Sequence, residues 1–175
     1  LDENNPHIKK FAKDGKIIYQ KSFGNHTYES EQKVSNTDVY DIASLTKIVA
    51  TLPNVMQEFD KGHLTLETKL RTILPVAKNS NKANATVLDM LTHQARFQPW
   101  IPFYKATLDS LNRPNSQFYR SEFSDEFPIH VADKLYLRKD YNDSIVKTIL
   151  DSELLPKKQY KYSDFSFILF KEYLE

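Results

Sequence analysis

The sequence predicts an α/β protein of the α+β type: a mostly helical body with a small antiparallel β element near its N-terminus. Residues 8–24 predict a β-hairpin, because two short arms carry apolar residues and Asp14-Gly15 provides a turn between them. Further along, several segments repeat apolar residues at helical spacing. Only 3 of the 175 residues are glycine, which argues against a turn-rich β-barrel and against a glycine-rich phosphate loop.

The first long helix is expected to begin near Ala43, after a polar, irregular stretch at residues 25–39. Its apolar face would consist of Ile48, Leu52, Val55, Met56 and Phe59. Gly62 stands where a left-handed residue would end the helix. Pro53 lacks a backbone donor and clashes with the preceding turn, so it predicts a kink or local irregularity.

Four further helices are expected. A short helix lies within residues 63–75, and a clearer one runs from about Thr86 to about Gln94, with Val87, Met90 and Leu91 facing inward. Residues 97–141 hold at most a helix after Pro102, followed by a long loop over 112–128. The last two helices lie in residues 142–156, closed by Pro156, and from an N-cap at Ser163 or Asp164 to the chain end.

Composition excludes several classes of function. The chain has 24 Lys and Arg against 23 Asp and Glu, so no basic excess indicates a nucleic-acid partner. No apolar run is long enough to span a membrane. The chain lacks cysteine, and its five histidines, at 7, 26, 63, 93 and 130, show no metal-ligand spacing. We therefore expect no metal and no cofactor, and a packing or capping role for His93.

The stretch YDIASLTKIVAT, residues 40–51, sets Ser44 and Lys47 three positions apart at an expected helix start. Residues at this spacing share one face of a helix. A serine hydroxyl needs a neighbour that takes its proton before it becomes a good nucleophile, and a desolvated lysine can do so. The pattern is common by chance, however, and from these four residues alone an exposed serine beside a solvated lysine is the more frequent explanation.

Two later segments add to this pattern. YSD at 162–164 places Tyr162 two residues before Asp164, and a tyrosine near serine and lysine can shuttle protons. Locally, the same letters also fit a packed tyrosine before a helix N-cap. The segment LDMLTHQARFQPW, residues 88–100, reads as an amphipathic helix followed by a loop, with Leu88, Leu91 and Trp100 expected in the core rather than at a substrate.

Taken in order, YDIASLTKIVAT, LDMLTHQ and YSDFSFIL resemble the penicillin-recognising serine hydrolases, the family of class C β-lactamases, D,D-peptidases and related esterases. The front hairpin KDGKIIYQKSFG is similar to that family's first strand pair. The resemblance implies that residues 1–175 form a single β-lactamase-related domain of the β-lactamase/transpeptidase-like fold. It also implies that Ser44 is the acylated nucleophile, Lys47 its base or proton partner, and Tyr162 a second general base. Asp164 occupies the position where the family usually has Asn.

The resemblance also has departures. The family's third motif, on a later strand of the main sheet, has no counterpart before Glu175, and the chain begins with Leu, so we expect an incomplete, truncated N-terminal part of a longer protein. Losing one oxyanion donor costs on the order of 10²–10³ in rate, so weak or no turnover is expected. Asp164 could also pair with Lys47 and keep it charged. HQARF stands where the family usually has a glycine-containing turn. We interpret Arg96 in this segment as a surface residue or, as the less favoured alternative, as a contact to a substrate carboxylate.

Two interpretations of function remain. The first is a serine hydrolase that acts through an acyl-enzyme on an amide or ester: a peptidoglycan D-alanyl peptide, a β-lactam or a small ester. The second is a non-catalytic binding or scaffold module beside another catalytic domain such as a glycoside hydrolase, to which similar domains are sometimes fused. The resemblance implies an extracytoplasmic location, periplasmic or secreted. An uncovered apolar face would favour self-association, or a fused or partner domain that completes the fold.

Overall fold

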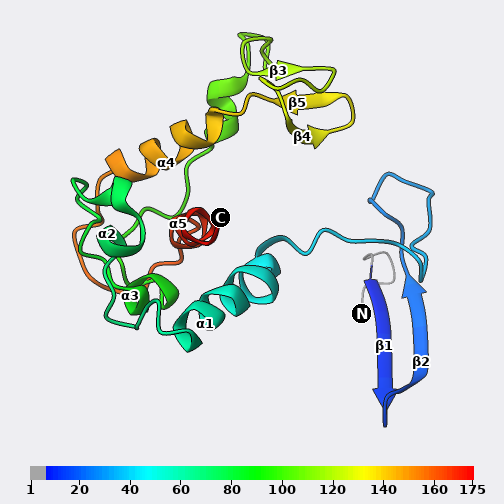
Figure 1. Cartoon of the computed structure of the whole chain (residues 1–175). Coiled ribbons are helices and arrows are strands. Elements are labelled where there is room, and N and C mark those ends of the chain that lie inside the picture. The colour runs from blue at the N-terminus through cyan, green and yellow to red at the C-terminus, as the bar shows by residue number, and fades with distance from the viewer. Residues whose placement is uncertain (1–6) are drawn as a thin grey trace. The chain divides into compact units, whose positions relative to one another are not determined.

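A computed structural model describes residues 7–175 (Figure 1). These residues combine helices with small antiparallel sheets, which confirms the expected α+β class. They fall into two compact units, of which the first ends at Ala43 and the second is Ser44–Glu175.

The first unit contains the predicted hairpin. Strands β1 (His7–Lys13) and β2 (Lys16–Phe23) pair antiparallel, and Asp14 and Gly15 turn the chain with φ of 50° and 74°. Positive φ at both turn residues is what a tight hairpin with right-handed strand twist requires, and Asp-Gly supplies it at little cost. The register shifts between Phe11 and Ala12, where the hairpin carries an irregularity.

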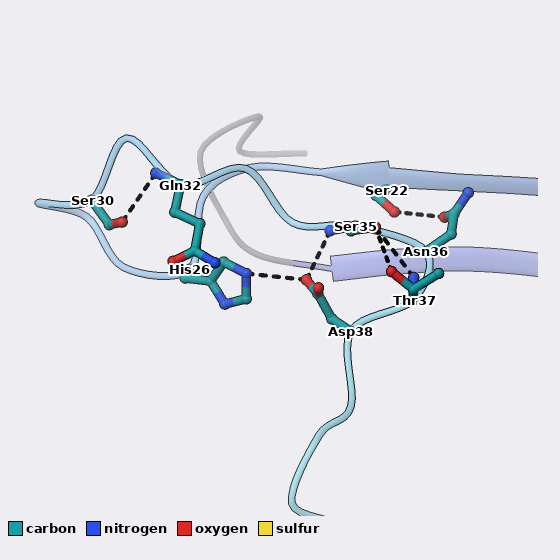
Figure 2. A network of polar contacts seen from close by, with 8 residues as sticks. All are labelled: Ser22, His26, Ser30, Gln32, Ser35, Asn36, Thr37 and Asp38. Carbon is teal, nitrogen blue, oxygen red and sulfur yellow. Dashed lines mark hydrogen bonds and ion pairs between the residues drawn. The ribbon is translucent and has the colours of Figure 1, made fainter.

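Polar side chains hold the irregular stretch that follows the hairpin (Figure 2). His26 Nε2 lies 3.1 Å from Asp38 Oδ2, and the same carboxylate oxygen accepts the Ser35 N–H at 2.7 Å. Ser22 Oγ donates to Asn36 Oδ1 at 2.6 Å, which ties the stretch back to β2. The prediction of a polar, irregular segment over residues 25–39 is confirmed, and these contacts explain how it keeps a defined path without a helix or strand.

The second unit begins with an irregular helix. A 3₁₀ turn at Ala43–Leu45 leads into a π-helical segment at Lys47–Thr51, and α1 (Leu52–Asp60) continues from it. The Leu52 N–H reaches back five residues to the Lys47 carbonyl, and the Asn54 side chain donates to the Ala50 carbonyl at 2.9 Å. The irregularity expected at Pro53 is therefore confirmed, since α1 takes a regular path only from the residue before this proline. Gly62 follows α1 with φ of 75°, as predicted.

The apolar face expected on this helix is buried only at Val55. Ile48, Met56 and Phe59 are each about half exposed. The spacing correctly predicts a common face, but within this unit most of that face is uncovered. Part of it borders a groove of about 310 Å³, lined by Leu52, Val55, Met56, Phe59, Asp60, Leu64, Leu66, Val87 and Leu91.

The core of the second unit surrounds α5 (Phe165–Leu174), which contacts α1, α3 and α4. Its sequence FSFILFKEYL is apolar on nearly all sides, and such a helix is expected at the centre of a core. Figure 1 shows α5 beside α1, α3 and α4, at the chain's C-terminal end. The core cluster consists of Val55, Leu64, Leu70, Ala77, Val87, Met90, Phe97, Val146, Ile149, Leu150, Phe165, Leu169 and Phe170.

The shorter helices follow the sequence with one correction. The short helix expected within residues 63–75 is α2 (Leu70–Ile73), and a 3₁₀ turn follows at Pro75–Ala77. Helix α3 (Val87–Leu91) starts as predicted, with Thr86 as N-cap, but the prediction that it reaches Gln94 is wrong. It ends at Leu91 because His93 adopts a left-handed backbone, with φ of 56°, which a right-handed helix cannot continue.

Residues 103–137 differ most from the expectation. The helix after Pro102 is a 3₁₀ turn, Phe103–Thr107. The long loop predicted over 112–128 contains a strand, β3 (Tyr119–Arg120). This strand pairs with β5 (Leu135–Leu137), which also pairs with β4 (Ile129–Ala132), so the three form an antiparallel sheet in the order β3-β5-β4. This sheet was not predicted from the sequence.

Helix α4 (Tyr141–Asp151) is the helix predicted in residues 142–156, although it ends before Pro156. Its last turn packs on Lys82, which is 1% exposed. Lys82 Nζ donates to the Ser152 carbonyl and to Asn81 Oδ1, the latter at 2.9 Å, and it lies 3.5 Å from the Leu150 carbonyl. Burial lowers the pKa of Lys82 to about 8, partly offset by Asp151. A buried amine at a helix C-terminus therefore binds the carbonyl groups that the helix leaves without partners.

Candidate active site

Ser44 lies in the first turn of the irregular helix, next to a strained backbone position. Ala43 has a left-handed φ of 44°, which costs a residue with a side chain about 1–2 kcal/mol. The Asp41 carboxylate accepts the Ala43 N–H at 2.6 Å and stabilises this bend. Ser44 follows the bend with an exposed side chain, at the end of the helix where backbone N–H groups have no helical acceptor.

Lys47 lies one turn further along. Its side chain is 16% exposed, and its Nζ donates to Ser44 Oγ at 3.2 Å. The same Nζ lies 2.6 Å from Asp164 Oδ1. The pairing of Asp164 with Lys47 that the sequence suggests is therefore present, and the ammonium group bridges the serine and the carboxylate.

Tyr162 comes from a segment 118 residues after Ser44. Its hydroxyl donates to Ser44 Oγ at 2.8 Å, and Lys47 Nζ lies 5.2 Å from the centre of its ring. Asp164 is the N-cap of α5, and its N–H bonds to the Pro99 carbonyl at 2.9 Å. The fold thus brings together Ser44, Lys47, Tyr162 and Asp164, the four residues that the sequence singles out.

Asp164 does not cap α5 with its side chain, because its carboxylate faces Lys47. The Ser163 side chain caps the helix instead. Its Oγ accepts the Phe165 N–H at 3.2 Å and donates to the Gln98 carbonyl at 2.6 Å. Ser163 therefore supports the start of the helix, which leaves the Asp164 carboxylate available to the site.

The electrostatics of the cluster assign charges to its members. Burial would lower the pKa of Lys47, but hydrogen bonds and charge interactions with Asp164 and Tyr162 outweigh burial and raise it above its ordinary value. Hydrogen bonds with Lys47 and with Ser44 lower the pKa of Tyr162, against opposing effects of burial and of Asp164. At neutral pH Lys47 is therefore an ammonium group. Tyr162 loses its proton at a lower pH than an ordinary tyrosine does.

His93 is part of this neighbourhood, although the sequence predicts for it only packing or capping. Its ring stacks against the Tyr162 ring at 4.5 Å between centroids, tilted by 37°, and also contacts Phe167 and Tyr160. Its Nδ1 accepts the Ser163 N–H at 3.2 Å. The packing role is confirmed, but the partners of His93 are the residues around Tyr162. Its position inside the segment LDMLTHQ is the signal that could have drawn attention to it.

Three other expectations in this region are corrected. Leu88 and Trp100 were expected in the core, but they are 46% and 59% exposed. Arg96 does not lie free on the surface, because its side chain is partly buried, while its alternative role as a substrate carboxylate contact stays a prediction. Its Nε donates to the Leu155 carbonyl at 2.6 Å, and its own carbonyl accepts the Leu155 N–H at 2.7 Å. Arg96 therefore links the loop after α3 to the loop after α4.

Neither a metal cluster nor a membrane span occurs within residues 7–175. Over that range no group of three or more His, Cys, Asp or Glu side chains could hold a metal ion. No helix in the same range combines the length and the apolar character needed to cross a bilayer.

Three solved structures share the fold of this chain. A candidate β-lactamase from Bacteroides dorei DSM 17855 matches with a TM-score of 0.58 and 18% identity, over 97% of this chain and 40% of its own. An octameric penicillin-binding protein homologue from Pyrococcus abyssi matches with a TM-score of 0.57 and 18% identity, over 95% and 33%. A class C β-lactamase from Rhodobacter sphaeroides matches with a TM-score of 0.51 and 21% identity, over 92% and 36%.

The chain thus spans 40% or less of the length of these three structures. No curated protein sequence matches it. The family model described as Beta-lactamase, however, matches residues 10–175, and this range includes Ser44, Lys47, Tyr162 and Asp164. The chain belongs to the β-lactamase family.

Proposed function

We propose that this chain carries the nucleophile of a serine hydrolase that works through an acyl-enzyme at Ser44. The observation that carries the proposal is the position of Ser44 Oγ, which lies 2.8 Å from the Tyr162 hydroxyl and 3.2 Å from Lys47 Nζ. A surface serine without a catalytic role does not need two groups that can transfer protons to be hydrogen-bonded to its hydroxyl oxygen. The family match covers these residues and supports the same interpretation.

Tyr162 acts as the base in this proposal, and Lys47 acts as its electrostatic partner. When Tyr162 has lost its proton, the bond to Ser44 reverses and Ser44 Oγ–H donates to the phenolate. Lys47 favours this state because its raised pKa keeps the ammonium charge in place beside the ring. The pKa of Tyr162 is lowered, so its phenolate form is reached more readily. Of the two roles that the family resemblance implies for Lys47, base or proton partner, the ion pair with Asp164 favours the second.

The proposed acylation moves one proton and one acyl group. Tyr162 takes the Ser44 proton as Oγ bonds to the substrate carbonyl carbon, and the carbonyl oxygen becomes an oxyanion near the Ser44 N–H. The bond to the leaving amine or alcohol then breaks, and the leaving group receives the proton from Tyr162. In deacylation a water oxygen bonds to the acyl carbon while Tyr162 takes a proton from that water. The bond between the acyl carbon and Ser44 Oγ then breaks, and Ser44 receives the proton from Tyr162.

The substrate class follows from this chemistry and from the relatives. An acyl-enzyme can form from an amide or an ester, so a peptidoglycan D-alanyl peptide, a β-lactam and a small ester all qualify. The solved relatives are named as β-lactamases and a penicillin-binding protein homologue, which supports a small-molecule or peptidoglycan-derived substrate. Such a substrate implies an extracytoplasmic location. Since the family match runs through both compact units, residues 1–175 belong, in this proposal, to one domain.

A second candidate function rests on Asp164. The Asp164 carboxylate, 2.6 Å from Lys47 Nζ, keeps that lysine protonated. This is the state expected of a lysine that takes no part in proton transfer. In this alternative the chain is a non-catalytic binding or scaffold module that accompanies another catalytic domain, such as a glycoside hydrolase.

Intact-protein mass after incubation with a penicillin and, separately, with a fluorophosphonate distinguishes the two candidates. The hydrolase proposal expects a mass increase of one acyl or phosphonyl group, which disappears in Ser44→Ala. Ser121→Ala, which removes another exposed serine, is the matched control and should keep the adduct. An adduct that persists in Ser44→Ala, or no adduct from either reagent, would favour the non-catalytic module.

A further inference from the structure

His93 contacts the backbone on both sides of Tyr162 as well as the tyrosine ring. The His93 carbonyl accepts the Lys161 N–H at 2.8 Å, and Nδ1 accepts the Ser163 N–H at 3.2 Å. Between these two bonds the imidazole stacks on the Tyr162 ring, with centroids 4.5 Å apart. One residue thus fixes three consecutive positions, 161–163, which lie about 70 residues further along the chain.

We propose that neutral His93 is a positioning residue that holds the Tyr162 hydroxyl against Ser44 and releases it when the imidazole is protonated. The proposal deepens the hydrolase function above and rests on it for its catalytic consequence. Its structural part, that His93 determines where Tyr162 lies, stands on the three contacts alone.

The hydrogen bond to Ser163 defines the chemical form of His93. Nδ1 can accept the Ser163 N–H only when it carries no proton, so the proton of the neutral ring lies on Nε2. Protonation would place a second N–H directly opposite the Ser163 N–H. Two donors cannot bond to each other, so the ring or the 161–163 backbone has to move.

The surroundings of the ring favour the neutral form. Burial and the Lys47 ammonium lower the pKa of His93, the Asp164 carboxylate raises it, and the net direction is downward. The other faces of the ring meet Tyr160, Tyr162 and Phe167. Lys47 and Asp164 are thus the charged groups that act on His93. Because the pKa of His93 is lowered, its protonation and the release of Tyr162 are expected at acidic pH.

The backbone of His93 supplies a matched pair of variants. At φ of 56°, asparagine and glycine are the residues best tolerated. His93→Asn keeps a side-chain oxygen that can accept the Ser163 N–H, and this oxygen does not titrate. His93→Gly fits the backbone and removes both the acceptor and the stacked ring. Neither variant is expected to unfold the chain, and far-UV circular dichroism checks this.

The test follows the tyrosine ring directly by NMR with ¹³Cζ-labelled tyrosine, with Tyr162→Phe to assign its resonance. In the wild type the resonance should shift twice, once at acidic pH below the ordinary His value of 6.5 and once below the ordinary Tyr value of 10.0. In His93→Asn the acidic step should vanish and the second step remain. In His93→Gly the second step should move up toward 10.0, because the hydroxyl is no longer held beside Lys47 and Ser44.

A folded His93→Gly variant with an unchanged Tyr162 titration would overturn the proposal, as would an acidic step that persists in His93→Asn. The catalytic consequence is read from the rate of labelling by the fluorophosphonate, expected within threefold of wild type in His93→Asn and lowered tenfold or more in His93→Gly. The NMR titration needs no activity. Absence of labelling in the wild type would therefore count against the hydrolase function, while the titration alone would still decide whether His93 positions Tyr162.

Discussion

Asp164 is the residue that most strongly affects the charges around Ser44. Its carboxylate raises the pKa of Lys47 through a hydrogen bond and through its charge, and it opposes the lowering of the Tyr162 pKa. The family usually has a neutral asparagine at this position. The carboxylate therefore makes Tyr162 a weaker acid than it would be beside the lysine alone, and the phenolate form becomes scarcer at neutral pH.

Asp164→Asn is expected to lower the pKa of both Lys47 and Tyr162. Loss of the carboxylate removes a partner that stabilises the ammonium, and it removes a negative charge that disfavours the phenolate. A base with a lower pKa is deprotonated at lower pH, so the curve of labelling rate against pH should shift to lower pH, and the rate at pH 7 should rise several-fold. The measurement is the rate of fluorophosphonate labelling between pH 5 and 10.

Asp125→Asn, at an exposed carboxylate elsewhere in the chain, is the control for Asp164→Asn and should leave the curve in place. A shift of the Asp164→Asn curve to higher pH would contradict the proposed division of roles between Tyr162 and Lys47.

Much of the site could be predicted from sequence because its residues lie in ordered motifs. Ser44 and Lys47 share a helical turn, and Tyr162 and Asp164 precede an apolar helix, so local spacing and family resemblance together single them out. The role of His93 could not be predicted in the same way. It depends on a left-handed residue at the end of α3 and on contacts with a segment about 70 residues away, and neither follows from local spacing.

At the scale of single elements, α3 shows how much a cap contributes to a short helix. Thr86 Oγ1 accepts the Asp89 N–H at 3.1 Å, and the five residues of α3 bring Val87 and Met90 into the core. Thr86→Ala should lower the free energy of unfolding by about 1 kcal/mol. In a chain of this size that corresponds to a fall in melting temperature of about 2–4 °C, measured by thermal circular dichroism.

Thr86→Ser retains the hydroxyl acceptor and should restore most of the loss. If Thr86→Ala and Thr86→Ser destabilised the chain equally, the cost would come from the lost methyl group and not from the cap.

The elements that could be predicted are those whose pattern is strong within one segment. The hairpin follows from Asp14-Gly15 and its flanking arms, and α4 and α5 follow from their apolar repeats. The β3-β5-β4 sheet could not be predicted because its strands have two to four residues, too few to show an alternating pattern. The spacing on α1 predicts a shared apolar face but contains no information on what covers it.

At the scale of the whole chain, the exposed apolar surface of α1 and of the π-helical segment before it has a consequence in solution. Ile48, Val49, Met56 and Phe59 are 48–60% exposed, beside the apolar groove described above. Contiguous apolar surface of this kind favours association. We therefore expect the isolated chain, of 20.5 kDa, to self-associate to an extent that increases with its concentration.

Size-exclusion chromatography with light scattering measures this association. Replacing Met56 by Glu and Phe59 by Lys keeps the net charge and should shift the population toward 20.5 kDa. A charge exchange at exposed positions, Glu122→Lys with Lys139→Glu, should leave the association unchanged. A wild-type chain that stays at 20.5 kDa at every concentration would contradict the expectation.

The burial of Lys82 makes this side chain a natural reporter of local opening. Acylating reagents attack neutral amines, and most other lysines of the chain are exposed to them at once, whereas Lys82 is 1% exposed and surrounded by carbonyl oxygens. Its amine becomes available only when the end of α4 separates from the turn at residues 80–83. The slow phase of acylation at Lys82, followed by peptide mass spectrometry, therefore measures how often this part of the protein opens while the rest stays folded.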